Sequence, residues 1–101
     1  MALLTERDRT YKTPEDIVAH VGDEYEKYEG AIVPPLFQNS LFVHPTEANG
    51  MTSSEFDYSR MSNPTLDIAE RKIAALEGGV AGLAVASGAS AITYPILGLA
   101  V

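Results

Sequence analysis

The middle of this chain constrains its fold more than any other part, because it carries the start and stop signals of successive elements. Asn63 is a good helix N-cap, and Pro64 suits the first helical position, where its missing N–H costs nothing. Gly78-Gly79 supplies a left-handed stop. Between these signals, apolar residues recur at spacings of three and four, at Leu66, Ala69, Ile73 and Leu76. The pattern predicts a helix over about 64–77.

A short apolar run, Gly82–Ala86, follows this helix. It has no polar alternation, which is typical of a strand buried on both faces of a parallel sheet. A helical segment also fits so short a run, but the glycine-containing turns on both sides favour a strand over about 82–86. Ser87-Gly88 then opens a second helix from about residue 88. The free N–H groups at such a start favour an anion, although a plain strand-to-helix turn is the simpler interpretation of these residues alone.

The first half of the chain is less regular. We expect residues 1–12 to form a polar tail, and Thr13-Pro14 to open a short helix over about 14–21. Asp23–Glu29 is acidic and aromatic, and we expect a solvated loop. Pro34-Pro35 forces an extended backbone, and the large apolar residues after it must lie against something else. The polar section Pro45–Phe56 predicts a mobile loop.

Composition and charge exclude several function classes. The net charge is −7 and no Lys/Arg cluster exists, so we expect no nucleic-acid partner. There is no cysteine, and His20 and His44 lie far apart, so we expect no metal site. Neither a secretory signal nor a membrane-spanning apolar segment is recognisable. These features predict a soluble cytoplasmic protein without a membrane partner.

The C-terminal section, Ala89–Val101, is apolar almost throughout. A helix that is apolar on all sides is usually buried, and Pro95 should kink it or end its first part. One buried strand and one buried helix cannot cover each other in so short a chain. We therefore expect a fragment, whose remainder is missing or is supplied by another chain.

Four motifs of the sequence occur in the order and spacing of one enzyme family: Tyr58-Ser59-Arg60, Asn63-Pro64-Thr65, Leu76-Glu77-Gly78-Gly79 and Ser87-Gly88. With them, the chain resembles the transsulfuration family of pyridoxal-phosphate (PLP) enzymes over roughly residues 20–101. That family includes cystathionine γ-synthase, methionine γ-lyase and O-acetylhomoserine sulfhydrylase. The resemblance implies an α/β fold of the fold-type I PLP-dependent transferases. Residues 1–56 would be its N-terminal arm and residues 57–101 the start of the large parallel-sheet domain.

The resemblance also implies a set of cofactor contacts. The backbone N–H groups of Ser87, Gly88 and Ala89 would bind the PLP phosphate, although the family usually carries Met or Gln where this chain has Ala89. Tyr58 and Arg60 would reach the phosphate of the neighbouring subunit's cofactor. The partners implied are an amino-acid substrate and further copies of the chain, in a homodimer or homotetramer with shared active sites.

The activity implied is β- or γ-elimination or γ-replacement on methionine, cystathionine or an O-acylhomoserine. Asp57 resembles the γ-synthase version of the loop, whereas Ser62–Leu66 and Ala84–Gly88 resemble methionine γ-lyase, so the subtype stays open. The family's Schiff-base lysine and the other catalytic residues belong beyond Val101. We therefore expect the 101-residue chain to be inactive by itself.

The sequence is also compatible with a function other than catalysis. The alternative is a non-catalytic module that binds an anion or mediates oligomerisation. A nucleotide-phosphate binder is disfavoured, because no Gly-Lys-[Ser/Thr] follows the Ser-Gly turn.

Overall fold

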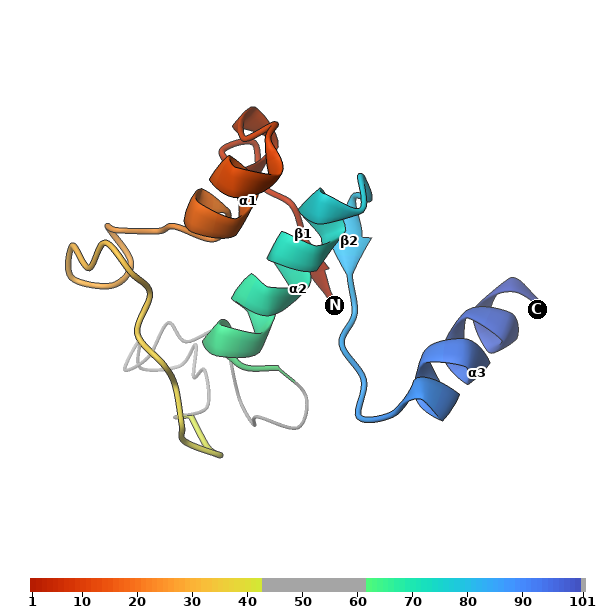
Figure 1. Ribbon diagram of the computed structural model, residues 1–101. Helices are drawn as coiled ribbons and strands as arrows, with labels where there is room; N and C mark the ends of the chain where they lie inside the picture. Colours follow the sequence, from red (N-terminus) through yellow and green to blue (C-terminus); the bar gives the residue numbers. More distant parts are fainter. Residues whose placement is uncertain (43–61, 101) are drawn as a thin grey trace, which may run out of the picture.

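A computed structural model describes residues 1–42 and 62–100. Its elements follow the order β1 (Ala2–Leu3), the 3-10 helix η1 (Asp8–Thr10), α1 (Pro14–His20), α2 (Pro64–Leu76), β2 (Ala81–Gly82) and α3 (Gly88–Leu99). In Figure 1, α2 lies at the centre, with α1 and the β1–β2 pair packed beside it. An extended linker leads from β2 to α3, which stands apart. None of the helices in the described part is long and apolar enough to cross a membrane.

The two capped helices form where the sequence predicts them. The Thr13 side chain accepts a hydrogen bond from the Asp16 N–H (3.2 Å), and α1 runs over Pro14–His20. The Asn63 side chain accepts one from the Thr65 N–H (2.8 Å), and α2 runs over Pro64–Leu76. Gly78 adopts a φ of 70°, as the predicted left-handed stop requires. Local capping chemistry therefore fixes the ends of these helices.

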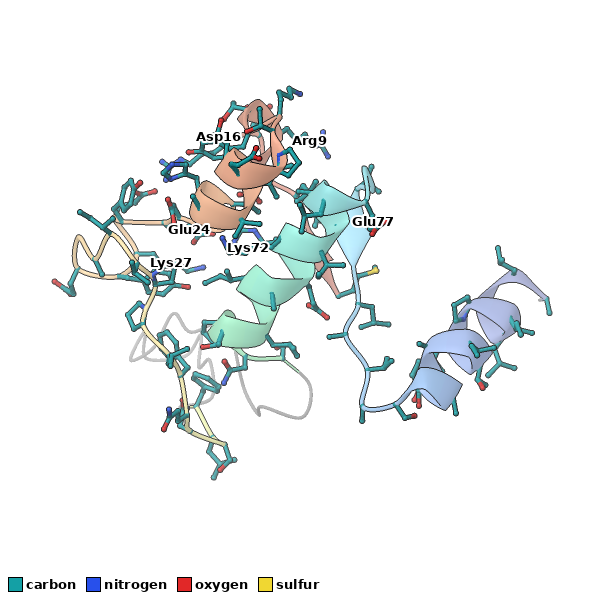
Figure 2. The ribbon with its side chains drawn as sticks, in the orientation of Figure 1. Arg9, Asp16, Glu24, Lys27, Lys72 and Glu77 are labelled. Atoms are coloured by element: carbon teal, nitrogen blue, oxygen red, sulfur yellow. The ribbon has the colours of Figure 1, made fainter. Side chains whose placement is uncertain are left out.

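The small core lies between α1, α2 and the β1–β2 pair. Its buried apolar side chains are Ala2, Ile17, Val21, Ile68 and Ala74. A hydrogen bond also joins α2 to α1, since the Nζ of Lys72 in α2 donates to the Val18 carbonyl oxygen of α1 at 2.6 Å (Figure 2). The core side of α2 is thus the face of Ile68 and Ala74, whereas Ile73 and Leu76 of the predicted apolar stripe are exposed.

The expectation of a polar N-terminal tail over residues 1–12 is wrong. β1 pairs antiparallel with β2, in the register Ala2 to Gly82 and Leu3 to Ala81. Asp8 is only 1% exposed. These residues look polar and local in sequence, but their partners come from α2 and β2, far along the chain.

The predicted solvated loop Asp23–Glu29 also needs correction at its beginning. Asp23 is buried, and Glu24 accepts a 2.6 Å hydrogen bond from Arg71 of α2. The segment turns back after these residues, because the Gly30 N–H donates to the Tyr25 carbonyl oxygen at 2.7 Å. Its two leading carboxylates therefore belong to the packed part of the protein.

The predicted strand over about 82–86, buried in a parallel sheet, differs from the structure. β2 covers only Ala81–Gly82, and its pairing is antiparallel. Leu83 is exposed, because no strand of the described residues lies on its other side. The extent of β2 is set by its partner β1, which is two residues long.

The C-terminal helix follows the predictions in part. α3 begins at Gly88 as expected and contains no buried residue, which fits the expectation that one strand and one helix cannot cover each other in so short a chain. It does not end at Pro95, which lies inside the continuous helix Gly88–Leu99. A proline ring removes one main-chain hydrogen bond, to the residue four positions earlier, and the other bonds of a three-turn helix can persist.

Candidate functional site

The start of α3 is the part of the described structure best suited to hold an anion. Ser87 is the N-cap, and its Oγ accepts a hydrogen bond from the Ser90 N–H at 3.2 Å. Ser87, Gly88 and Ala89 are all exposed. A helix start leaves N–H groups without intrahelical acceptors, and the helix dipole adds partial positive charge there.

Two further features of this turn favour a dianion such as a phosphate group. The first turn of α3 contains no acidic side chain. A Cβ placed on Gly88 would meet nothing within 4 Å, so an approaching group finds open space. The donor set of Ser87, Gly88 and Ala89 therefore fits a phosphate by its chemistry and by its access.

Glu70 of α2 positions the chain that leads to this turn. Its side chain is 6% exposed, and its Oε2 accepts a hydrogen bond from the Ala84 N–H at 2.7 Å. Gly82 packs so closely on α2 that a Cβ there would overlap the Glu70 carbonyl oxygen. Through these contacts α2 holds the segment immediately before Ser87. Sequence reasoning missed Glu70, because a helical glutamate looks like a solvated surface residue.

An apolar pocket of about 280 Å³ lies along α3. Its lining residues come from the extended segment before the turn and from the helix itself: Leu83, Val85, Ser90, Ala91, Tyr94 and Pro95. This mostly apolar surface includes Val85 and Ser90, which flank the turn at Ser87-Gly88.

The Asn63-Pro64-Thr65 motif does more than begin α2. Thr65 Oγ1 accepts a hydrogen bond from the Phe37 N–H at 2.8 Å, and Asn63 Nδ2 donates to the Phe37 carbonyl oxygen at 3.2 Å. The motif therefore binds the main chain of a residue far away in sequence. The cap is predictable from the sequence but this contact is not, because no local pattern points to Phe37.

The other predicted contacts, Tyr58 and Arg60, lie outside the described residues, as do His44 and the predicted loop Pro45–Phe56. His20 lies at the C-terminal end of α1, where its Nδ1 is 3.2 Å from Asp23 Oδ2. Across residues 1–42 and 62–100, no group of His, Cys, Asp and Glu side chains is arranged to hold a metal ion.

A buried ionic cluster occupies the face of α2 that packs on the N-terminal segment. Arg71 Nη1 donates to Glu24 Oε1 at 2.6 Å, and Arg71 also binds the Asp8 carboxylate. Burial alone would raise the pKa of Asp8, but hydrogen bonds from Arg71, Thr5 and Gly22 outweigh it and hold that pKa below its usual range. The carboxylates of this cluster are already bound by protein donors, so we interpret it as structural.

Comparison with known proteins gives a consistent picture. The family model described as "Cys/Met metabolism PLP-dependent enzyme" matches residues 15–101. L-methionine gamma-lyase of Pseudomonas putida is 46% identical over 79 residues, which are 73% of this chain and 20% of that protein. O-acetyl-L-homoserine sulfhydrylase of Leptospira meyeri is 38% identical over 96 residues, 90% of this chain and 22% of that protein. Cystathionine gamma-lyase of Dictyostelium discoideum is 38% identical over 76 residues, 75% of this chain and 19% of that protein.

The chain thus spans about a fifth of the length of these curated relatives. No solved structure matches it significantly.

Proposed function

This chain belongs to the Cys/Met metabolism PLP-dependent enzymes, and on that premise we propose that it is the N-terminal part of a sulfur amino-acid enzyme. The reaction of the whole protein is β- or γ-elimination or γ-replacement on methionine, cystathionine or an O-acylhomoserine. Relatives named as lyases and as a sulfhydrylase support this range. When bound, PLP supplies the electron sink for such reactions, and the protein must hold and orient it.

The finer fold assignment is part of the proposal. We assign the chain to fold type I, with residues 1–56 as the arm and residues 57–101 as the start of the large domain. The order α2, β2, α3 supports this assignment. So do the exposed large apolar side chains on α2 and α3, which include Ile73, Leu76, Ile92, Ile96, Leu97 and Leu99. In the whole protein, further parts of the large domain would cover them.

The exposed N-terminus of α3 is the observation that carries the functional proposal. Ser87, Gly88 and Ala89 offer main-chain donors to the PLP phosphate, with no acidic side chain in the first turn to repel it. A main-chain contact tolerates Ala89 in place of the family's usual Met or Gln. Tyr58 and Arg60 would add a phenol and a guanidinium to the phosphate of a neighbouring subunit's cofactor. That arrangement makes the working unit a homodimer or homotetramer with shared active sites.

Replacement of Gly88 by Asp tests this assignment in the intact protein. A Cβ at this position meets nothing within 4 Å, and an acid in the first turn of a helix is favourable for folding. The carboxylate would, however, stand where we place the phosphate. We expect Gly88→Asp to weaken PLP binding, measured by equilibrium dialysis, by roughly tenfold or more while the melting temperature holds. Gly88→Asn, of nearly the same shape but uncharged, should bind PLP much more tightly than the aspartate variant.

A second comparison separates the enzyme from the alternative anion-binding module. Pyridoxal, which lacks the phosphate, should bind both variants equally. If inorganic phosphate protects the wild-type protein against heat as well as PLP does, the site is a general anion site and the enzyme proposal fails. Equal PLP affinity of the aspartate and asparagine variants would instead remove the start of α3 from the site.

A further inference from the structure

The strand β2, which leads toward the candidate anion site, is held on two sides (Figure 1). On one side it pairs with β1, in the register Ala2 to Gly82, and the Leu4 N–H donates to the Val80 carbonyl oxygen at 3.0 Å. On the other side Gly82 packs on α2, where a Cβ would overlap the Glu70 carbonyl oxygen. β2 therefore contacts both β1 and α2.

The segment 2–8, which contains β1, is also attached to α2 directly. Asp8 accepts two hydrogen bonds from Arg71, at 2.8 and 3.0 Å. Arg71 follows Glu70 in sequence, and Glu70 Oε2 accepts from the Ala84 N–H at 2.7 Å. Two consecutive residues of α2 thus bind the segment 2–8 and the chain that enters α3.

This segment lies before the part of the chain that the family model matches, which is residues 15–101. Its contacts nevertheless reach close to the candidate site. Ala84 is three positions before the N-cap Ser87, and the whole path from β1 through β2 to Ser87 lies within the described residues. The segment 2–8 can therefore influence the start of α3 through contacts that the structure shows.

We propose that the segment 2–8 is a positioning element for the start of α3. This rests on the proposed function, in which Ser87, Gly88 and Ala89 offer their N–H groups to the PLP phosphate. By holding β2 against α2, the segment fixes the chain as far as Ala84. Residues that are fixed before a ligand binds lose less conformational entropy on binding, so the phosphate is bound more tightly.

The first test removes one hydrogen bond between the segment and the chain before β2. Leu4→Pro lacks the N–H that donates to Val80, and the residue before it lies in β1, in the extended conformation that a following proline favours. Leu4→Ala also shortens the side chain but keeps the N–H, so it is the matched control. The dissociation constants of PLP and of pyridoxal, the melting temperature and the amide hydrogen exchange at Ala84 are measured in the intact protein.

We expect Leu4→Pro to weaken PLP binding by roughly three- to tenfold, the effect of one lost hydrogen bond, and to speed exchange at the Ala84 amide. Leu4→Ala should keep both quantities near the wild-type values. Pyridoxal affinity should not change in either variant, since pyridoxal lacks the phosphate that the start of α3 binds.

A second pair of variants tests the contact between β2 and α2. Gly82→Ala places a Cβ against the Glu70 carbonyl oxygen and should push β2 away from α2, so PLP binding should weaken while pyridoxal binding holds. Gly79→Ala adds the same methyl group nearby, where the nearest atom, the Ala74 carbonyl oxygen, is 3.6 Å away. The Gly79 variant should bind PLP as the wild type does.

The wild-type protein provides a test that does not depend on the folding of any variant. Coupling between two parts of a protein is reciprocal. At equal saturation, bound PLP should therefore slow amide exchange at Leu4 and Ala84 more than bound pyridoxal does.

Three results would overturn the positioning role. A folded Leu4→Pro variant with wild-type PLP affinity would show that the segment 2–8 is only structural. Equal losses of affinity for PLP and pyridoxal would show a general distortion. Equal slowing of exchange by the two ligands would show that the phosphate is not coupled to the segment. Failure of the proposed function is distinguishable, because in that case the wild-type protein itself binds PLP no better than pyridoxal.

Discussion

Arg71 grips the carboxylate of Asp8, 63 positions earlier in the chain, with two hydrogen bonds: Nε to Oδ2 at 2.8 Å and Nη2 to Oδ1 at 3.0 Å. Asp8 also accepts from the main-chain N–H groups of Thr5 and Gly22, both at 3.1 Å. Arg71 and Asp8 are almost fully buried, at 4% and 1% exposed. This one ion pair therefore joins the N-terminal segment to α2, and together with the two main-chain N–H groups it saturates the acceptor capacity of Asp8.

Removing the arginine should destabilise the protein strongly. Arg71→Met leaves the buried Asp8 carboxylate without its cation and removes the 2.6 Å bond to Glu24, and we expect a loss of about 3–5 kcal/mol in the free energy of unfolding. Urea denaturation measures it. Arg9→Met removes an exposed arginine next to Asp8 and should change stability by no more than about 0.5 kcal/mol. Similar losses for the two variants would mean that the buried Arg71–Asp8 pair contributes no more to the free energy of unfolding than an exposed arginine does.

The same cluster predicts sensitivity to acid. Burial raises the pKa of Glu24, but the Arg71 hydrogen bond and the charge of Lys27 outweigh it, so its pKa is lowered like that of Asp8. A lowered folded-state pKa gives stability that is present above the unfolded value, about 4, and is lost as the pH falls through the folded value. We expect the urea midpoint to fall below about pH 4, less steeply in Asp8→Asn than in the wild type.

Asp67 offers a contrast within the same cluster. Burial raises its pKa, and the opposing attraction of Arg71, whose Nη1 lies 3.4 Å away, does not compensate. Ionisation of Asp67 therefore costs stability as the pH rises through its folded-state pKa. Since its side chain is 35% exposed, the effect is screened. Asp67→Asn should change the urea midpoint at pH 7 only slightly, and a loss as large as that of Asp8→Asn would contradict this assignment.

Arg71 also shows what sequence patterns can and cannot reveal. The i,i+4 rule finds Asp67, the most distant of its three carboxylate partners, because that rule requires only helical spacing. The shorter bonds go to Asp8 and Glu24, and no local pattern connects those residues to α2. The helix ends were predictable for the opposite reason, since Thr13, Asn63 and Ser87 cap by contacts within three residues.

In the candidate site too, the features that depend on local sequence were predictable and those that depend on distant partners were not. The Ser87-Gly88 turn was predictable because a helix start is defined by its own residues. The length of β2, the burial of Glu70 and the hydrogen bonds of Asn63 and Thr65 to Phe37 were not, because each depends on a partner from another part of the chain. A strand prediction in particular assumes neighbours, and in the described residues β2 has only β1.

Gly22 should be intolerant of any side chain. Its φ is 94°, and a Cβ would lie 2.7 Å from Cγ2 of Ile68. Gly30 has a similar φ of 81°, but a Cβ there would meet nothing within 4 Å. A substitution at Gly30 therefore measures the backbone strain without the clash. We expect Gly30→Ala to cost about 1 kcal/mol and Gly22→Ala about 2–4 kcal/mol, by thermal or urea unfolding. Equal costs would indicate that Ile68 moves aside freely.

Glu70 should matter for both stability and cofactor binding. Its Oε2 accepts from the Ala84 N–H at 2.7 Å, three residues before Ser87. Glu70→Ala leaves that N–H without its acceptor and should cost about 1–3 kcal/mol of stability. Because Ala84 leads directly to the turn at Ser87, the same variant should weaken PLP binding. Glu70→Gln keeps a carbonyl oxygen for Ala84 and should restore most of both properties. If the glutamine variant binds PLP as poorly as the alanine variant, the carboxylate charge rather than the hydrogen bond controls the turn.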